Sequence, residues 1–169
     1  MGSRLLPRDL HELYAHALAL EHAAAKRFVE LERYTRDAGM DHIADELRSI
    51  GQEEREQYEL LAVGIGERDL PKLSGWEYAA HFLGPQADAE RVPRNVRDAL
   101  ALALAMERRT QNFYVDVAEH AADDAMCAFA GEMALDEGRH IARLERLLAR
   151  EPDSGAARPG EGDVLPLKP

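Results

Sequence analysis

The sequence predicts an all-α protein, an antiparallel four-helix bundle with one long crossover between the second and third helices. Apolar residues recur at helical spacing over four long segments with few helix breakers. A helical Glu, followed about thirty residues later by an acidic pair that opens Glu-x-x-(His/Gln), occurs twice. The chain has 169 residues, of which 46% are hydrophobic. It is therefore long enough to form one domain with a sizeable core.

The first helical hairpin is predicted from two segments joined by a short turn. Apolar positions at helical spacing extend over about residues 8–37 and again over about 41–63, and Gly64-Ile65-Gly66 ends the second segment. Between the two segments, Gly39 suits the left-handed position just after a helix. Asp41 is expected to be the N-cap of the second helix because its side chain can accept from exposed backbone amides.

The second hairpin is predicted to start near Pro93 or Asn95 and to run to about residue 121. Its second helix spans about 124–150, and the turn between them offers an Asp as N-cap. About thirty residues, 64–93, connect the two hairpins, too many for a tight turn. Such a length can run along the full side of a bundle, so it allows the third helix to start at either end.

The predicted domain covers residues 1–150. Residues 151–169 are rich in Pro and Gly and are predicted to form a flexible C-terminal tail. Within the crossover, residues 74–83 form a short aromatic segment that contains Trp76 and Phe82. This segment is expected to pack as a lid on the bundle, with a dimer contact as the alternative. Residues 164–167, close to the end of the tail, are interpreted as part of a frayed terminus or as a docking peptide.

The repeated acidic pattern predicts a metal site. Its members are Glu21 with Glu54 and Gln57, and Glu107 with Glu137 and His140. The midpoint of the first Glu pair falls between Asp37 and Ala38, and that of the second falls at Ala122, in both cases within a predicted turn. Residues equidistant from the turn of an antiparallel hairpin lie level with each other. Each carboxylate pair is therefore expected to face across its hairpin.

Four inward carboxylates need neutralisation, and two divalent cations would supply it. His140 follows Glu137 by three residues, on the same helix face, and is predicted to be a metal ligand. Gln57 holds the corresponding place in the first copy. Its interpretation stays open between a weak carbonyl ligand, an outer hydrogen-bond partner and no contact with the metal. The other histidines are treated as surface or packing residues: His11, His16, His22, His42, His81 and His120.

Composition excludes several classes of function. The net charge of −11 argues against nucleic acid as a partner, because phosphates favour basic surfaces. No segment approaches the roughly 20 uncharged residues of a membrane helix, and the N-terminus has no long apolar stretch typical of a signal peptide. A cytoplasmic location is the expectation. The single cysteine, Cys127, excludes a disulfide framework or a four-cysteine site within the chain.

The chain resembles the ferritin-like superfamily, in particular rubrerythrin-like and bacterioferritin-like di-iron carboxylate proteins. The resemblance covers residues from about 8 to 150 and rests on the four Glu, on His140, and on Phe28 and Tyr114, each seven residues after a helix Glu. It implies two iron ions, with manganese or zinc as alternatives. It also implies bridging roles for Glu54 and Glu137, terminal roles for Glu21 and Glu107, and a place for Tyr114 beside the ligands.

Three departures from the family pattern bear on function. Gln57 replaces a histidine, and Thr110 stands where rubrerythrins place a further Glu. No Cys-x-x-Cys rubredoxin segment is present, so electrons would come from an external donor.

The sequence therefore predicts a dinuclear iron protein that oxidises Fe(II) with dioxygen or peroxide. The predicted protein is a non-haem di-iron oxidoreductase of the ferroxidase or peroxidase type, and it is expected to assemble as a homodimer or larger homo-oligomer. Two alternatives stay open. One is a metal-binding or storage protein without turnover, because a missing imidazole weakens one metal position. The other is a non-catalytic helical interaction module with a vestigial site.

Overall fold

The computed structural model describes residues 6–66, 70–73 and 91–152, and these form four helices. The helices are α1 (Leu10–Asp37), α2 (Asp41–Ile65), α5 (Val96–His120) and α6 (Asp124–Arg150). The described ranges contain no strand, so the prediction of an all-α four-helix bundle is confirmed. None of the described helices is sufficiently long and apolar to cross a bilayer.

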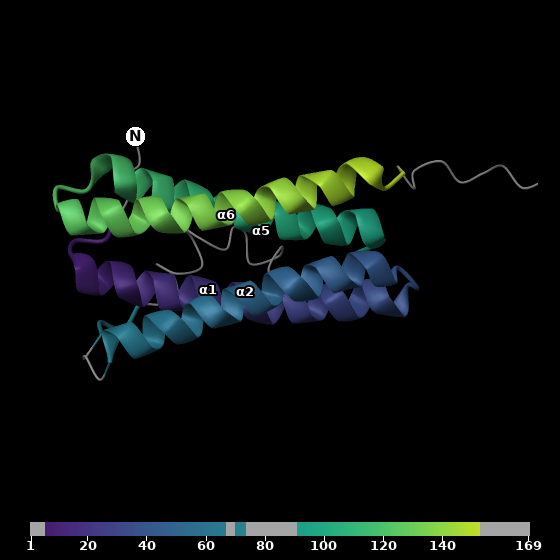
Figure 1. The fold of residues 1–169 in the computed structure, drawn as a ribbon, viewed down its shortest axis with the longest axis horizontal. Coiled ribbons are helices and arrows are strands. Elements are labelled where there is room, and N and C mark those ends of the chain that lie inside the picture. The colour runs from purple at the N-terminus through teal and green to yellow at the C-terminus, as the bar shows by residue number, and fades with distance from the viewer. Residues whose placement is uncertain (1–5, 67–69, 74–90, 153–169) are drawn as a thin grey trace, which may run out of the picture.

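The helices form two antiparallel hairpins, α1 with α2 and α5 with α6, whose long axes run in the same direction (Figure 1). Both predicted turns are present. α2 ends at one end of the bundle and α5 begins at the other, which decides the question that the crossover length left open (Figure 1). The aromatic segment 74–83 and tail residues 153–169 lie outside the described residues.

Three of the helices start at a side-chain cap, in which an Asp or Asn accepts from a backbone amide of the first turn. The caps are Asp9 of α1, Asn95 of α5 and Asp123 of α6. The expected cap of α2 is wrong. Met40 holds the N-cap position because its carbonyl accepts from the amides of Ile43 and Ala44, and it makes no side-chain cap bond. Asp41 is thereby moved into the first turn, and Gly39 (φ 77°) makes the left-handed turn as expected.

Two apolar clusters fill the bundle, one toward each end. Members of the cluster near the α1–α2 turn include Phe28, Leu31, Leu47, Leu100 and Leu144. Members of the other cluster include Leu13, Leu20, Phe113, Tyr114 and Met133. Along α1, Glu21 lies directly between residues of the two clusters, and Glu107 and Glu137 do so along α5 and α6. The bundle therefore contains a polar layer between two apolar cores.

Candidate metal centre

All four helices contribute a buried ionisable side chain to this polar layer. The exposed fractions are 1% for Glu21, 1% for Glu54, 0% for Glu107, 3% for Glu137 and 3% for His140. Each residue sits on the inward face of its helix, among the apolar positions that drive the helices together. A carboxylate in such surroundings destabilises the fold unless a proton or a cation neutralises it.

Four of these residues converge on a single point. Glu54, Glu107, Glu137 and His140 each offer one ligand atom, and the four atoms lie within 4.8 Å of one another. His140 Nδ1 is 2.7 Å from Glu54 Oε1 and 3.2 Å from Glu107 Oε2. Three carboxylates and one imidazole are an oxygen-rich donor set of the kind that suits iron or manganese.

Glu21 lies beside this group of four rather than within it. The Tyr114 hydroxyl donates a hydrogen bond to Glu21 Oε1 at 2.8 Å. Burial, followed by the negative charges of Glu54 and Glu137, raises the pKa of Glu21 well above its usual value. The same neighbours act on Tyr114, where burial and then the charge of Glu21 raise the pKa of the phenol. Tyr114 therefore acts as a donor that orients Glu21.

The electrostatics of the layer favour bound positive charge. Burial, and then the charges of neighbouring carboxylates, raise the pKa values of Glu107 and Glu137 well above the usual range. Burial opposes protonation of His140, but the adjacent Glu54 and other carboxylates outweigh it and raise the pKa of the imidazole. Protons and metal ions are alternative ways of neutralising the same cluster.

The donor atoms fit a metal ion. Four buried carboxylate oxygens, one each on Glu21, Glu54, Glu107 and Glu137, have no hydrogen-bond partner among the described residues, and Glu54 Oε1 pairs with His140 Nδ1. Buried polar atoms are rarely left in this way, and a bound ion is one common means of satisfying them. The residues present therefore fit a bound metal ion, in agreement with the metal site that the sequence predicts.

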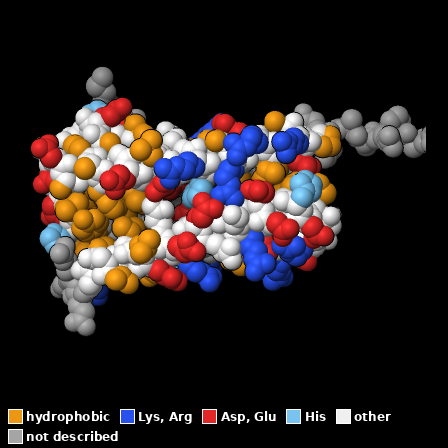
Figure 2. Space-filling model, viewed as in Figure 1, with side chains coloured by type: hydrophobic (Ala, Val, Ile, Leu, Met, Phe, Trp, Pro, Cys, Tyr) orange, Lys and Arg blue, Asp and Glu red, His pale blue; other side chains and the backbone are white. Residues whose placement is uncertain are grey.

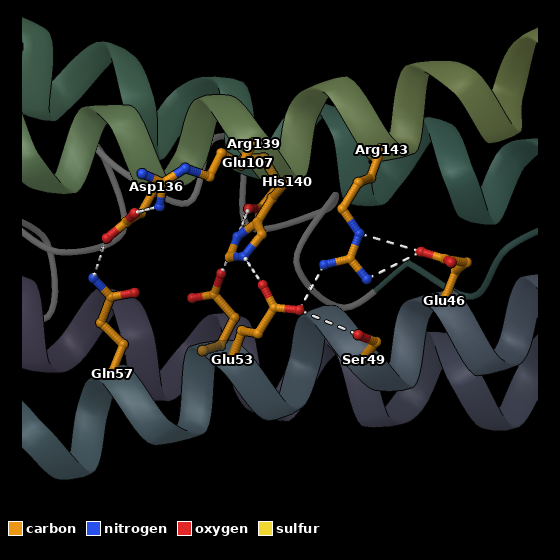
Figure 3. Close-up of polar contacts among 10 residues, drawn as sticks. Glu46, Ser49, Glu53, Gln57, Glu107, Asp136, Arg139, His140 and Arg143 are labelled. Carbon is orange, nitrogen blue, oxygen red and sulfur yellow. Dashed lines mark hydrogen bonds and ion pairs between the residues drawn. The ribbon is translucent and has the colours of Figure 1, made fainter.

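Two positions do not contribute to the group of four. The Gln57 amide donates to Asp136 Oδ2 at 3.2 Å and to Met133 Sδ at 3.1 Å, and its side chain points across to α6 away from His140 (Figure 3). The Thr110 hydroxyl donates to the Met106 carbonyl of its own helix. The counterpart of His140 in the first copy of the pattern therefore points away from the group of four, so the two halves of the layer are chemically unequal.

Sequence reasoning missed a pair of residues in contact with the layer. His140 Nε2 lies 3.2 Å from Glu53 Oε2, and Arg143 donates to Glu53 Oε1 at 2.6 Å (Figure 3). Burial opposes ionisation of Glu53, but Arg143 and His140 outweigh it and lower its pKa. A signal existed, because Arg143 follows His140 by three residues and so shares its helix face.

Comparisons with known proteins agree with this fold and site. The sequence model of the ferritin-like domain matches residues 12–153. An uncharacterized conserved protein from Magnetospirillum magnetotacticum, known from a crystal structure, is 26% identical, with a TM-score of 0.75 over 85% of this chain and 96% of that one. A search of curated proteins found no match. The match covers the four helices except for the first two residues of α1, and it covers every residue of the polar layer. The chain therefore belongs to the ferritin-like domain family.

Proposed function

We propose that this protein binds two iron ions in the polar layer and oxidises Fe(II) with dioxygen or peroxide. The observation that carries the proposal is the convergence of Glu54, Glu107, Glu137 and His140 on one buried point, with Glu21 beside them. Two Fe(II) ions would supply the two electrons that reduce one peroxide to water. Manganese or zinc would fit the same oxygen-rich donors.

The chain's own residues would prepare the site in three ways. Glu54 and Glu137, which lie near both Glu21 and the His140 side of the layer, would bridge the ions. Glu107 with His140 would complete one position, and Glu21, held by Tyr114, would complete the other. The apolar clusters on both sides exclude bulk water, which strengthens each electrostatic interaction inside.

The position of Gln57 favours a second candidate, a metal-binding or storage protein without turnover. Because its amide is engaged with Asp136 and Met133, the Glu21 side of the layer offers carboxylates alone. An ion at this position would bind more weakly than one beside His140. A protein that holds only one ion firmly has no partner ion for a two-electron reaction.

Metal analysis tests both candidates. After anaerobic reconstitution with Fe(II), we expect close to two iron ions per chain, bound in two steps of unequal affinity, because only one position has an imidazole. Titration with metal content measured per chain gives both quantities. A single ion without oxidation would favour the storage candidate. An absence of bound iron, manganese and zinc would rule out both.

Replacing Gln57 with histidine should strengthen the weaker position. Gln57 lies one turn after Glu54 on α2. A histidine at this position can reach the Glu21 side of the layer if its side chain does not keep the contact that Gln57 makes with Asp136. We expect the second binding step to tighten by about tenfold or more, the usual scale of a change around a metal ligand. The matched control is Gln52→His, an exposed position on the same helix. An unchanged second step would mean that position 57 cannot reach the ions.

We also propose the setting in which this reaction occurs. An external electron donor would serve the reaction, and the acidic composition supports a chain that does not bind nucleic acid. A cytoplasmic location and a homodimer or larger homo-oligomer complete the proposal. Sedimentation of the full chain with and without iron measures the assembly.

A further inference from the structure

The backbones of the two hairpins approach each other most closely between α1 and α5, whereas long polar side chains close the seam between α2 and α6. The backbones within each hairpin pack closely, whereas α2 and α6 approach each other chiefly through side chains. Arg143 of α6 donates to Glu53 at 2.6 Å and to Glu46 at 3.0 Å, both on α2 (Figure 3). Acidic and basic side chains alternate across the middle of this face, while hydrophobic side chains gather toward one end (Figure 2).

The seam connects solvent with the polar layer through one imidazole. The Glu53 side chain is 47% exposed, that of Arg143 is 20% exposed, and that of His140 is only 4% exposed. His140 faces Glu53 with Nε2, and it faces Glu54 and Glu107 with Nδ1. On the other side of the layer, Tyr114 and Glu21 are buried. The path from water to the unpartnered carboxylate oxygens is therefore short at Glu53.

We propose that Glu53 and Arg143 form a cation gate, in which Glu53 binds an incoming divalent cation before it passes His140, and Arg143 occupies Glu53 until the cation arrives. This inference rests on the proposed metal-binding function. The guanidinium holds one oxygen of Glu53 and adds positive charge at the seam, both of which oppose a cation. Glu53 is a transient partner and not one of the resident ligands.

The charges of this gate give its two members opposite effects on the rate of metal uptake. A carboxylate at the mouth of a path raises the local concentration of cations, so removing its charge slows association. Removing the guanidinium frees Glu53 and deletes a repulsive charge, so association becomes faster. A purely structural salt bridge would give both variants the same sign, because either change breaks the same contact.

Uptake of Co(II) by the full-length metal-free chain tests the gate, with stopped-flow absorption as the readout. We expect Glu53→Gln to slow uptake by about tenfold and Arg143→Gln to accelerate it by about threefold. The number of ions bound at equilibrium should stay that of the wild type. Both differences should shrink at about 1 M salt, where interactions between exposed charges are screened.

The matched controls are Glu145→Gln and Arg108→Gln. These residues form an exposed Arg–Glu pair between α5 and α6, with an N–O distance of 2.6 Å, away from the α2–α6 seam. The control variants carry the same changes of net charge and should take up Co(II) at the wild-type rate. Equal rates for the control and gate variants would overturn the gate.

Two further outcomes separate this inference from the function on which it rests. Fewer bound ions in Glu53→Gln would make Glu53 a resident ligand and overturn its role as a gate. A wild-type chain that binds neither Co(II) nor Fe(II) would remove the metal-binding function itself. A wild-type chain that binds both, with rates unaffected by either gate variant, would remove the gate alone.

Discussion

Replacing Glu137 with glutamine should reduce Fe(II) oxidation by more than about a hundredfold, since losing even an outer partner of a metal ligand typically costs 10–100-fold. Glu137 lies in the group of four and also acts electrostatically on Glu21, so it is placed to contact both of the proposed ions. We expect the variant to lose both ions, whereas Glu21→Gln should lose only the weaker one. Fe(II) oxidation followed by absorption, together with iron content per chain, measures these effects.

The stability of the same variant should change in the opposite sense. Without metal, burial and the neighbouring carboxylates disfavour a charged Glu137, and glutamine removes that charge while nearly preserving the volume of the side chain. The metal-free variant should therefore melt no lower than metal-free wild type. Glu132→Gln, an exposed change on the same helix, is the control and should oxidise Fe(II) normally. A lower melting temperature with persistent oxidation would make Glu137 a structural residue.

The metal-free protein should lose stability as the pH rises from about 5 to about 8. The pKa values of Glu21, Glu107 and Glu137 are raised in the folded state, first by burial. The folded state therefore binds more protons than the unfolded state above the usual Glu pKa, and stability falls as pH rises toward the folded values. The raised pKa of His140 acts in the same direction. Asp98, with a pKa of about 2, contributes in the opposite sense only at lower pH.

Thermal unfolding of the metal-free chain across this pH range measures the effect. A tenfold difference in proton affinity is worth about 1.4 kcal/mol. About 1 kcal/mol moves the melting temperature of a chain of this size by roughly 2–4 °C. Several degrees should be lost, and bound metal should reverse the trend because cations replace the protons. Glu21→Gln should reduce the dependence of the melting temperature on pH, whereas Glu145→Gln, a change at an exposed position, should not. A melting temperature that rises over this range would contradict the proposed burial of charge.

Local patterns in the sequence are sufficient to predict much of the fold. Helical spacing of apolar residues, with caps such as Asn95 and Asp123, is a short-range signal, and both hairpin turns lie where the Glu midpoints place them. The same midpoints predict that carboxylates of one hairpin lie level. Hairpin geometry needs only residue counts, so no tertiary information is required. The predicted N-cap of α2 is wrong because the helix begins one residue earlier than expected. Met40 takes the N-cap position, and Asp41 lies in the first turn.

By itself, the sequence determined the fold class, the family resemblance and the buried positions of Glu21, Glu54, Glu107, Glu137 and His140. Only the tertiary structure decided how the two hairpins face each other, because their register depends on packing between segments distant in sequence. That packing turns Gln57 toward Asp136 and brings Glu53 of α2 between His140 and Arg143 of α6. Helix periodicity predicts which face of a helix a side chain lies on. Which residue of the other hairpin that side chain contacts depends on how the two hairpins pack together.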